Sequence, residues 1–401
     1  MTSEWHEVPL RELVGYISKG IAPSYAEEAS ETTIRVLNQK CNRNFRISYG
    51  DSRLHDTLKK KVPPERYVKP DDILINSTGA GTAGRIAQIE DVPSATTIDG
   101  HMILIRSNGK VTQKFLGYAL KAHQWEVLQL DEGSTGQTEL NRDRLLDEIM
   151  INYPVSFDEQ NAIVGTLESI DRKLIVNKEI NDNLEQQAQS YFQELFVDNA
   201  DPEWTTGTIS DLGTVVGGST PSKAKPEYYT ESGIAWITPK DLSNNKSKFV
   251  SHGENDITEL GLRNSSASIM PEGTVLFSSR APIGYIAIAA GEVTTNQGFK
   301  SVVPKPEIGT PFVYFFLKNT LPVIEGMASG STFKEVSGST MKNVPAVIPD
   351  AETLAKFSDF CAPIFAQQRI LEEQNQSLAT LRDNLLPKLM SGEIDVSAVQ
   401  L

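Results

Sequence analysis

Residues 158–196, DEQNAIVGTLESIDRKLIVNKEINDNLEQQAQSYFQELF, decide how this chain is organised. The segment contains no proline and one glycine, and its apolar side chains recur at steps of four and three. That average step of 3.5 residues is typical of the seam of a coiled coil. At a rise of 1.5 Å per residue, such a helix would extend over about 58 Å, which overruns a domain of ordinary size. We therefore expect a long helix that separates domains.

A second segment near the C-terminus repeats this seam at an offset of 194 residues. The expected seam positions are Ile163, Leu167, Ile170, Leu174, Asn181 and Leu184 in the first helix and Ile364, Leu371, Asn375, Leu378 and Leu385 in the second. Asn181 and Asn375 occupy equivalent positions, and a buried asparagine in a seam sets register and partner orientation. Asp158 is the expected N-cap of the first helix, and Pro349-Asp350 precedes the second. Two separate amphipathic helices on different domains remain the alternative.

The remainder of the chain is also duplicated. Ile34–Lys40 resembles Ile234–Lys240 at an offset of 200, and Phe115–Lys121 resembles Phe312–Lys318 at an offset of 197. Two copies indicate an internal duplication and not a solenoid. Each copy alternates short β-branched runs with Gly, Pro and Asn, so we expect an α/β (mixed α+β) fold in both.

This organisation predicts four segments, namely a first α/β domain at 1–155, a central helix at 156–200, a second α/β domain at 201–349 and a C-terminal helix at 350–401. The expected strands of the first domain are Asp72–Ser77, Arg85–Ile89 and His101–Arg106, and the expected helices of the two domains are Phe115–Leu130 and Phe312–Glu325.

The net charge of −14 is distributed unevenly over the 401 residues. Segments 156–200 and 350–401 together carry −10, and the two α/β segments are close to neutral. The longest apolar runs are far shorter than the roughly 20 residues of a membrane span, and the N-terminus has no signal-peptide pattern, so we expect a cytoplasmic protein. The two cysteines and five histidines show no metal-ligand spacing, so no metal site is expected.

Residues 35–69 hold ten basic groups against three acidic ones. Clustered cations neutralise phosphates, and Arg, Lys, Asn and Gln read base edges, so this stretch is a candidate for DNA contact. Hydroxyl-bearing Gly loops that recur in both halves are further candidates. The complete candidate set is Lys40, Arg43, Arg46, Arg53, Lys59, Lys60, Lys61, Ser77, Thr78, Ser134, Thr135, Lys240, Ser279, Arg280, Asn296, Gln297, Ser331 and Lys334. The alternatives are a solvated basic loop and ordinary turns.

Gly79-Ala-Gly-Thr-Ala-Gly84 fits the G-x-G-x-x-G pattern of dinucleotide-binding proteins. That fingerprint requires a helix that opens at the glycines, whereas Arg85–Ile89 has the composition of a strand. The sequence shows no convincing nucleophile, base or metal cluster, so we expect no active site.

Two variable α/β units that alternate with two similar long helices resemble the specificity subunit of type I restriction-modification systems. The most specific stretches are Asp158–Asp171, Leu184–Phe192, Ser278–Tyr285, Asn296-Gln297-Gly298 and Leu381–Glu393. The first unit departs from the pattern, because Ser77-Thr-Gly-Ala-Gly stands where the second unit has Ser279-Arg-Ala-Pro-Ile. A DNA contact by Arg280 therefore has no clear counterpart in the first unit.

The resemblance implies that each α/β unit is a target-recognition domain that reads one half of a split site in double-stranded DNA. It also implies that the helices form an antiparallel coiled coil, hold the units apart and dock two modification subunits, with restriction subunits joining the complex. S-adenosylmethionine, ATP and Mg²⁺ would be bound by those other subunits. Since the basic stretch at 35–69 lacks an equally basic counterpart at 234–269, we expect two different half-sites. A nucleotide-cofactor enzyme and a coiled-coil DNA-binding regulator are the alternatives.

Overall fold

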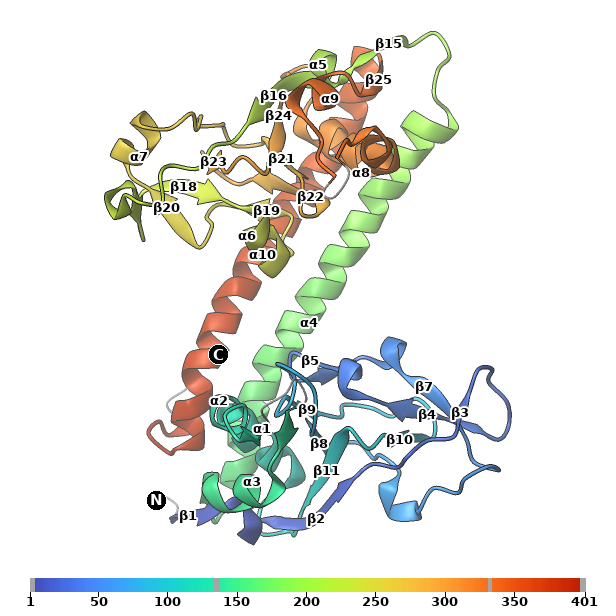
Figure 1. The fold of residues 1–401 in the computed structure, drawn as a ribbon, viewed down its shortest axis with the longest axis vertical. Coiled ribbons are helices and arrows are strands. Elements are labelled where there is room, and N and C mark those ends of the chain that lie inside the picture. Colours follow the sequence, from blue (N-terminus) through green and yellow to red (C-terminus); the bar gives the residue numbers. More distant parts are fainter. Residues whose placement is uncertain (1–3, 133–137, 331–333, 397–401) are drawn as a thin grey trace. The chain divides into compact units, whose positions relative to one another are not determined.

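The computed structural model describes residues 4–132, 138–330 and 334–396. The chain forms two compact units, which we call the first unit (residues 1–173 and 378–401) and the second unit (residues 174–377). The helices α4 (Phe157–Gln193) and α10 (Ala351–Met390) each contribute to both units (Figure 1). No helix among the described residues is long and apolar enough to span a membrane.

The first unit contains two four-stranded sheets. Their orders are β2-β11-β8-β9, which is antiparallel, and β10-β4-β7-β3, in which β10 and β4 are parallel. The elements are β1 (Trp5–Pro9), β2 (Val14–Lys19), β3 (Tyr25–Ala26), β4 (Thr33–Leu37), β5 (Asn42–Arg43), β6 (Arg46–Ile47), β7 (Arg53–Asp56), β8 (Ile73–Asn76), β9 (Ile86–Gln88), β10 (Thr96–Ile98), β11 (Met102–Ser107), α1 (Gln113–Ala122), α2 (Gln124–Val127), β12 (Asp131–Glu132), β13 (Glu139–Leu140), α3 (Arg142–Glu148) and β14 (Met150–Pro154).

The second unit repeats this arrangement and adds one strand, β19, which pairs in parallel with β22. Its sheets have the orders β16-β24-β21-β22-β19 and β17-β20-β18-β23, again with one parallel pair, β18 and β23, in the smaller sheet. The elements are β15 (Thr205–Thr208), α5 (Ile209–Leu212), β16 (Gly213–Gly217), β17 (Tyr229–Thr230), β18 (Ile234–Ile237), α6 (Pro239–Asn244), β19 (Phe249–Val250), β20 (Asn255–Ile257), α7 (Glu259–Arg263), β21 (Val275–Ser279), β22 (Ile283–Ala289), β23 (Thr294–Thr295), β24 (Lys300–Pro304), α8 (Thr310–Met327), α9 (Gly338–Lys342) and β25 (Pro345–Ile348). The shared strand order confirms the duplication and the mixed α/β class.

One helix packs on the β2-β11-β8-β9 sheet of the first unit, another packs on the five-stranded sheet of the second unit, and each closes the core of its unit. In the first unit, Thr112 caps α1 by accepting from the Phe115 N–H at 3.2 Å, and Phe115 and Leu116 are fully buried. In the second unit, Phe312 and Phe315 of α8 take the same role. The expected helix at Phe312–Glu325 is confirmed, and the one at Phe115–Leu130 is divided at His123 into α1 and α2.

The two long helices pack against each other in antiparallel fashion within each unit. In the second unit, Asn177 donates to Asn375 at 2.9 Å, and one turn further along α4 the Asn181 carbonyl accepts from Gln368 at 3.1 Å. In the first unit, Arg382 of α10 contacts Asp171 of α4 at 3.3 Å. Residue numbers rise along one helix as they fall along the other, which confirms the expected coiled coil.

The seam is not uniform along its length. Ile163, Leu167 and Ile170 are almost fully buried, and Ile163 and Leu167 belong to the same apolar cluster as the sheet of the first unit. Ile364 likewise belongs to the core of the second unit. Leu371 is buried as well, whereas Leu174, Leu184, Leu378 and Leu385 are half-buried. Each helix therefore uses its apolar stripe both for its partner helix and for a globular core.

The N-cap expected at Asp158 is wrong. The Ser156 hydroxyl accepts from the Glu159 N–H at 3.4 Å, and Asp158 lies inside the first turn of α4. In the first turn, a carboxylate stabilises the helix by interacting with the positive end of the helix dipole, and it does not act as an N-cap. Asp350 does cap α10, because its carboxylate accepts from the Thr353 N–H at 2.9 Å.

Candidate nucleic-acid interface

An open groove of about 540 Å³ lies on the first unit between the turn after β4 and the loop after β8. We call this the first groove; its lining residues are Gln39, Lys40, Arg43, Asn44, Gly79, Ala80, Thr82 and Arg85. Asn38 shapes one wall, because its side chain accepts from the Lys40 N–H at 2.9 Å and tightens the turn. Lys40 and Arg43 are exposed as a result.

The other wall is the glycine-rich loop at residues 79–84. Gly79, Gly81 and Gly84 have φ values of 120°, 67° and 83°, which favour glycine, and a Cβ at Gly79 would lie 2.3 Å from the Thr82 hydroxyl. The loop joins β8 to β9, and no helix opens at its glycines. The dinucleotide-fingerprint interpretation of this segment is therefore wrong, since a pyrophosphate would have no helix N-terminus to meet.

The cations of the first groove face no carboxylate among the described residues. The Arg43 guanidinium donates to the Lys40 carbonyl at 3.2 Å, and the Arg85 guanidinium donates to the Gly81 carbonyl at 3.1 Å. These contacts orient the side chains and leave their positive charge uncompensated. The groove can therefore bind a polyanion.

The second unit carries a groove of about 480 Å³ at the equivalent place, which we call the second groove. Its lining residues are Thr220, Lys223, Trp236, Thr238, Pro239, Lys240, Asp241, Glu254, Asn255, Arg280, Ala281, Asn296, Gln297 and Gly298. Lys240 follows β18 as Lys40 follows β4. Thr238 is the N-cap of α6, and its backbone N–H donates to the Asp241 carboxylate at 2.7 Å.

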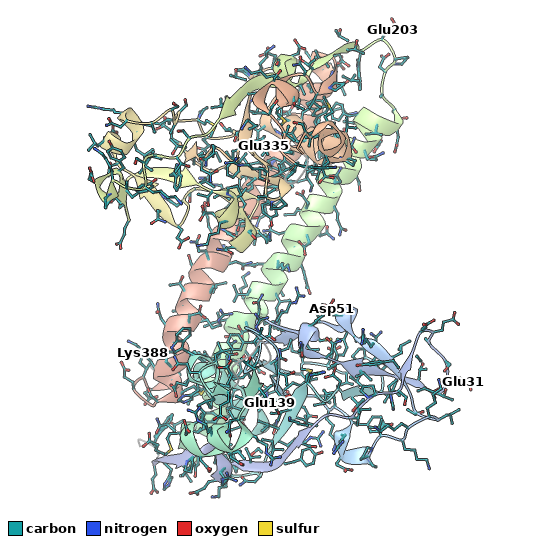
Figure 2. All side chains as sticks on the ribbon, viewed as in Figure 1. Glu31, Asp51, Glu139, Glu203, Glu335 and Lys388 are labelled. Carbon is teal, nitrogen blue, oxygen red and sulfur yellow. The ribbon has the colours of Figure 1, made fainter. Side chains whose placement is uncertain are left out.

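Two of the three cations that line the second groove, Lys240 and Arg280, are held in ion pairs, whereas Lys223 has none with a described residue. Lys240 contacts Glu254 at 2.6 Å, and this contact raises the pKa of the Lys240 amine. Arg280 contacts Glu335 at 3.5 Å (Glu335 is labelled in Figure 2). Asn296 accepts from the Gly298 N–H at 2.8 Å, and Thr220 donates to the exposed Gln297. The second groove thus has the same position as the first and a different electrostatic character.

Two of the candidate DNA contacts are wrong. Ser77 and Ser279 are fully buried, and their hydroxyls donate to the carbonyls of Gly100 and Gly298 at 3.4 and 3.1 Å. Both serines close the connection between two strands and have no access to a ligand. Thr78 is half-buried and hydrogen-bonded to His101 at 2.7 Å.

The basic stretch at 35–69 is not gathered into one patch. Lys40 and Arg43 line the first groove, Arg46 pairs with Glu90 at 3.0 Å, and Arg53 lies over the Tyr25 ring at 4.6 Å. Three consecutive exposed lysines, Lys59, Lys60 and Lys61, follow β7 and do not line the first groove.

Lys334 is exposed and also outside the second groove. Ser134, Thr135 and Ser331 lie outside the described residues.

Several residues that line the grooves are absent from the set of candidates that the sequence predicts. Gln39, Asn44 and Arg85 in the first groove, and Lys223 and Asn255 in the second, have side chains suited to DNA contact. The match between Ile34–Lys40 and Ile234–Lys240 was the signal that marked one wall of both grooves. Nothing in the local sequence marks Arg85, because it reaches the groove only through the pairing of β8 with β9.

A charged cluster attaches each α/β part to the long helices of its own unit. In the first unit, Asp171 accepts from Tyr118 at 2.9 Å and from Lys121 at 3.1 Å, in addition to its contact with Arg382. Burial alone raises the pKa of the Asp171 carboxyl, but these partners outweigh burial and hold that pKa below its ordinary value.

The cluster of the second unit uses the matching pair of side chains on α8. Tyr314 donates to Glu185 of α4 at 3.2 Å, and the same carboxylate contacts Lys318 and Lys248, both at 2.5 Å. Burial raises the pKa of the Glu185 carboxyl, and the two lysines lower it further than burial raises it. Both α/β parts are therefore anchored to the helices by a tyrosine and a lysine that share one carboxylate.

Comparison with known proteins agrees with this architecture. The family model described as type I restriction modification DNA specificity domain matches residues 2–186 and again residues 202–381. Over 194 residues the chain is 39% identical to the type I restriction enzyme MjaIX specificity subunit of Methanocaldococcus jannaschii, an alignment that covers 46% of this chain and 45% of that protein. It is 28% identical to the HindI specificity subunit of Haemophilus influenzae, with 48% and 42% covered. The chain thus spans a little under half the length of these curated relatives in the alignments.

A solved structure shows the same fold over nearly the whole chain. The crystal structure of a type I restriction-modification S subunit from M. genitalium matches with a TM-score of 0.62 and 18% identity, and the match covers 97% of this chain and 96% of that one. The family model matches both repeats, each of which includes one α/β part and one long helix. The chain belongs to the type I restriction modification DNA specificity domain family.

Proposed function

We propose that this chain is a non-catalytic specificity subunit that reads a bipartite, asymmetric site in double-stranded DNA. One observation carries the proposal: two grooves lie at equivalent positions of two repeated units, and both combine a lysine at the end of a strand with amide side chains. Each unit would read one half of the site, and the paired long helices would set the distance between the halves.

The lining of the grooves suits the chemistry of a duplex. Lys40, Arg43 and Arg85 can neutralise phosphates, which supplies affinity that is independent of sequence. Gln39 and Asn44 in the first groove, and Asn255 and Gln297 in the second, can form paired hydrogen bonds with base edges. Because the two sets of side chains differ, the two half-sites should differ, and the full site should not be palindromic.

The long helices suit protein partners better than DNA. Their segments hold −10 of the net charge, and they expose Val176, Ile180, Ile370 and Leu381 by 39 to 47%. Acidic surfaces repel a phosphate backbone, and exposed apolar side chains favour a protein interface. We propose that two modification subunits dock there and that restriction subunits join them. S-adenosylmethionine, ATP and Mg²⁺ would act through those partners, in the cytoplasm where the DNA lies.

Neither alternative function is favoured. A nucleotide-cofactor enzyme depended on residues 79–84, which form a turn between two strands. A coiled-coil regulator would use its helices to associate with a second copy, whereas here α4 and α10 pack with each other within each unit.

Methylation mapping tests the proposal. DNA from cells that hold this chain together with its modification partner should carry methyl groups at one split motif with a fixed spacer. Cells that lack either protein serve as the control and should carry none at that motif. A contiguous motif, or the same motif without this chain, would contradict the proposal.

A further inference from the structure

The two grooves differ in how their cations are compensated. In the first groove, Lys40, Arg43 and Arg85 have no carboxylate partner among the described residues. In the second groove, Lys240 and Arg280 each contact a carboxylate, namely Glu254 and Glu335, and only Lys223 lacks such a partner among the described residues. Because the fold and the position of the grooves are the same, this difference belongs to the side chains and not to the scaffold.

The backbone holds both glutamates in place. The Glu254 N–H donates to the Asp241 carboxylate at 2.9 Å, directly beside the turn that carries Lys240. Glu335 exchanges two backbone hydrogen bonds with Ser329, at 3.1 and 2.9 Å, and its carboxylate also lies 3.9 Å from the Lys300 amine. The carboxylates themselves remain 61% and 41% exposed, so they are available to an approaching ligand.

A phosphate that approaches Lys240 or Arg280 in the second groove meets a cation that is already compensated. It must separate each cation from its glutamate, and the released carboxylate then lies close to the duplex, where like charges repel. A scrambled duplex offers the two cations only phosphates, which they reach by leaving their glutamates, so it bears the full cost. A cognate duplex also offers matching base edges to the groove and depends less on those phosphate contacts, so the glutamates penalise other sequences more than the correct one.

We propose that Glu254 and Glu335 are specificity-determining residues that suppress binding of non-cognate DNA by the second unit. The first groove then supplies most of the sequence-independent, salt-sensitive affinity, and the second groove supplies discrimination. This inference rests on the proposed function, since it assumes that the grooves bind a duplex.

The test compares the parent complex with complexes that contain Glu254→Gln or Glu335→Gln, each assembled with the modification subunit. The probes are a duplex that carries the motif found by methylation mapping and a scrambled duplex of equal length, and binding is titrated over a range of salt concentrations. Each variant should bind the scrambled duplex several-fold more tightly. The slope of the logarithm of its association constant against the logarithm of the salt concentration should become steeper by roughly one unit for each freed cation. The ratio of its affinity for the cognate duplex to its affinity for the scrambled duplex should fall.

Glu325→Gln is the matched control, because it makes the same charge change at an exposed position of α8 outside the groove lining. It should leave both affinities and the slope unchanged. Circular dichroism of every variant checks that the fold is retained.

Two results would overturn the inference. Unchanged binding of the scrambled duplex would show that the ion pairs do not restrain the cations. Loss of cognate binding alone would show that a glutamate reads a base directly, as a carboxylate does with the cytosine amine. Failure of the proposed function has a different signature, in which the parent complex itself does not discriminate between the two duplexes.

Discussion

Replacement of Asp171 by asparagine should destabilise the attachment of the α/β part of the first unit to the long helices. The Asp171 carboxylate accepts hydrogen bonds from Tyr118 and Lys121 and contacts Arg382, so the variant leaves a lysine that is only 12% exposed without its carboxylate partner. An asparagine has nearly the same shape, so the change removes charge and little packing.

The expected cost follows from burial. Removal of one partner from a buried ion pair costs about 3–5 kcal/mol. The Asp171 side chain is 21% exposed to solvent, and Arg382 retains a second carboxylate partner, Asp383, at 2.7 Å. We therefore expect the free energy of unfolding of the first unit to fall by about 2–3 kcal/mol, below the fully buried case.

Urea unfolding followed by circular dichroism measures the change, and hydrogen exchange read by mass spectrometry locates it. Protection should fall in α1 and at residues 378–390, whereas α8 of the second unit should keep its protection. Asp383→Asn is the matched control, because Asp383 contacts the same arginine but is 64% exposed, and it should cost about 0–1 kcal/mol. Equal effects of the two variants, or equal loss of protection in α1 and α8, would refute the reasoning.

Three further predictions concern the charged clusters, the core of the first unit and the first groove. Acid should weaken both charged clusters, because the pKa values of Asp171 and Glu185 are lowered in the folded chain. The two carboxylates contribute their full stabilisation above the unfolded-state pKa values near 3.8 and 4.5, and this stabilisation is lost as the pH falls through the folded-state pKa values. Urea midpoints measured from neutral pH to about pH 3 should therefore drop more steeply for the parent than for Asp171→Asn, and parallel curves would contradict this. Leu167 is fully buried and belongs to both the seam and the core of the first unit, so Leu167→Ala should lower the free energy of unfolding in urea by about 2–5 kcal/mol. Val176→Ala, at an exposed position, should change it by no more than about 0.5 kcal/mol. Similar costs for the two variants would mean that Leu167 does not belong to the core. Asn44→Asp adds a carboxylate to the first groove without a change of shape, so it should lower the affinity for a scrambled duplex, and an unchanged affinity in a gel-shift titration would remove the first groove from the interface.

The sequence alone predicts the features that depend on local periodicity and on the repeat. The 3.5-residue period of residues 158–196 requires no distant partner to be recognised, because an apolar stripe on one helix face is a property of neighbouring turns. The duplication likewise places Lys40 and Lys240 at matching sites, since two similar segments adopt similar backbones. Lys40 and Lys240 were therefore accessible to sequence reasoning, whereas Lys223, which has no counterpart in the candidate set, was not.

Burial and ion pairing were decided by the tertiary structure. Ser77 and Ser279 belong to polar segments, yet strand pairing places both in the interior. Arg280 meets Glu335 only because a distant segment returns beside the end of β21. Such contacts join residues that are far apart in the chain, and no local pattern encodes them. For this reason the sequence shows where cations occur, and only the packed sheets show which of them face a carboxylate.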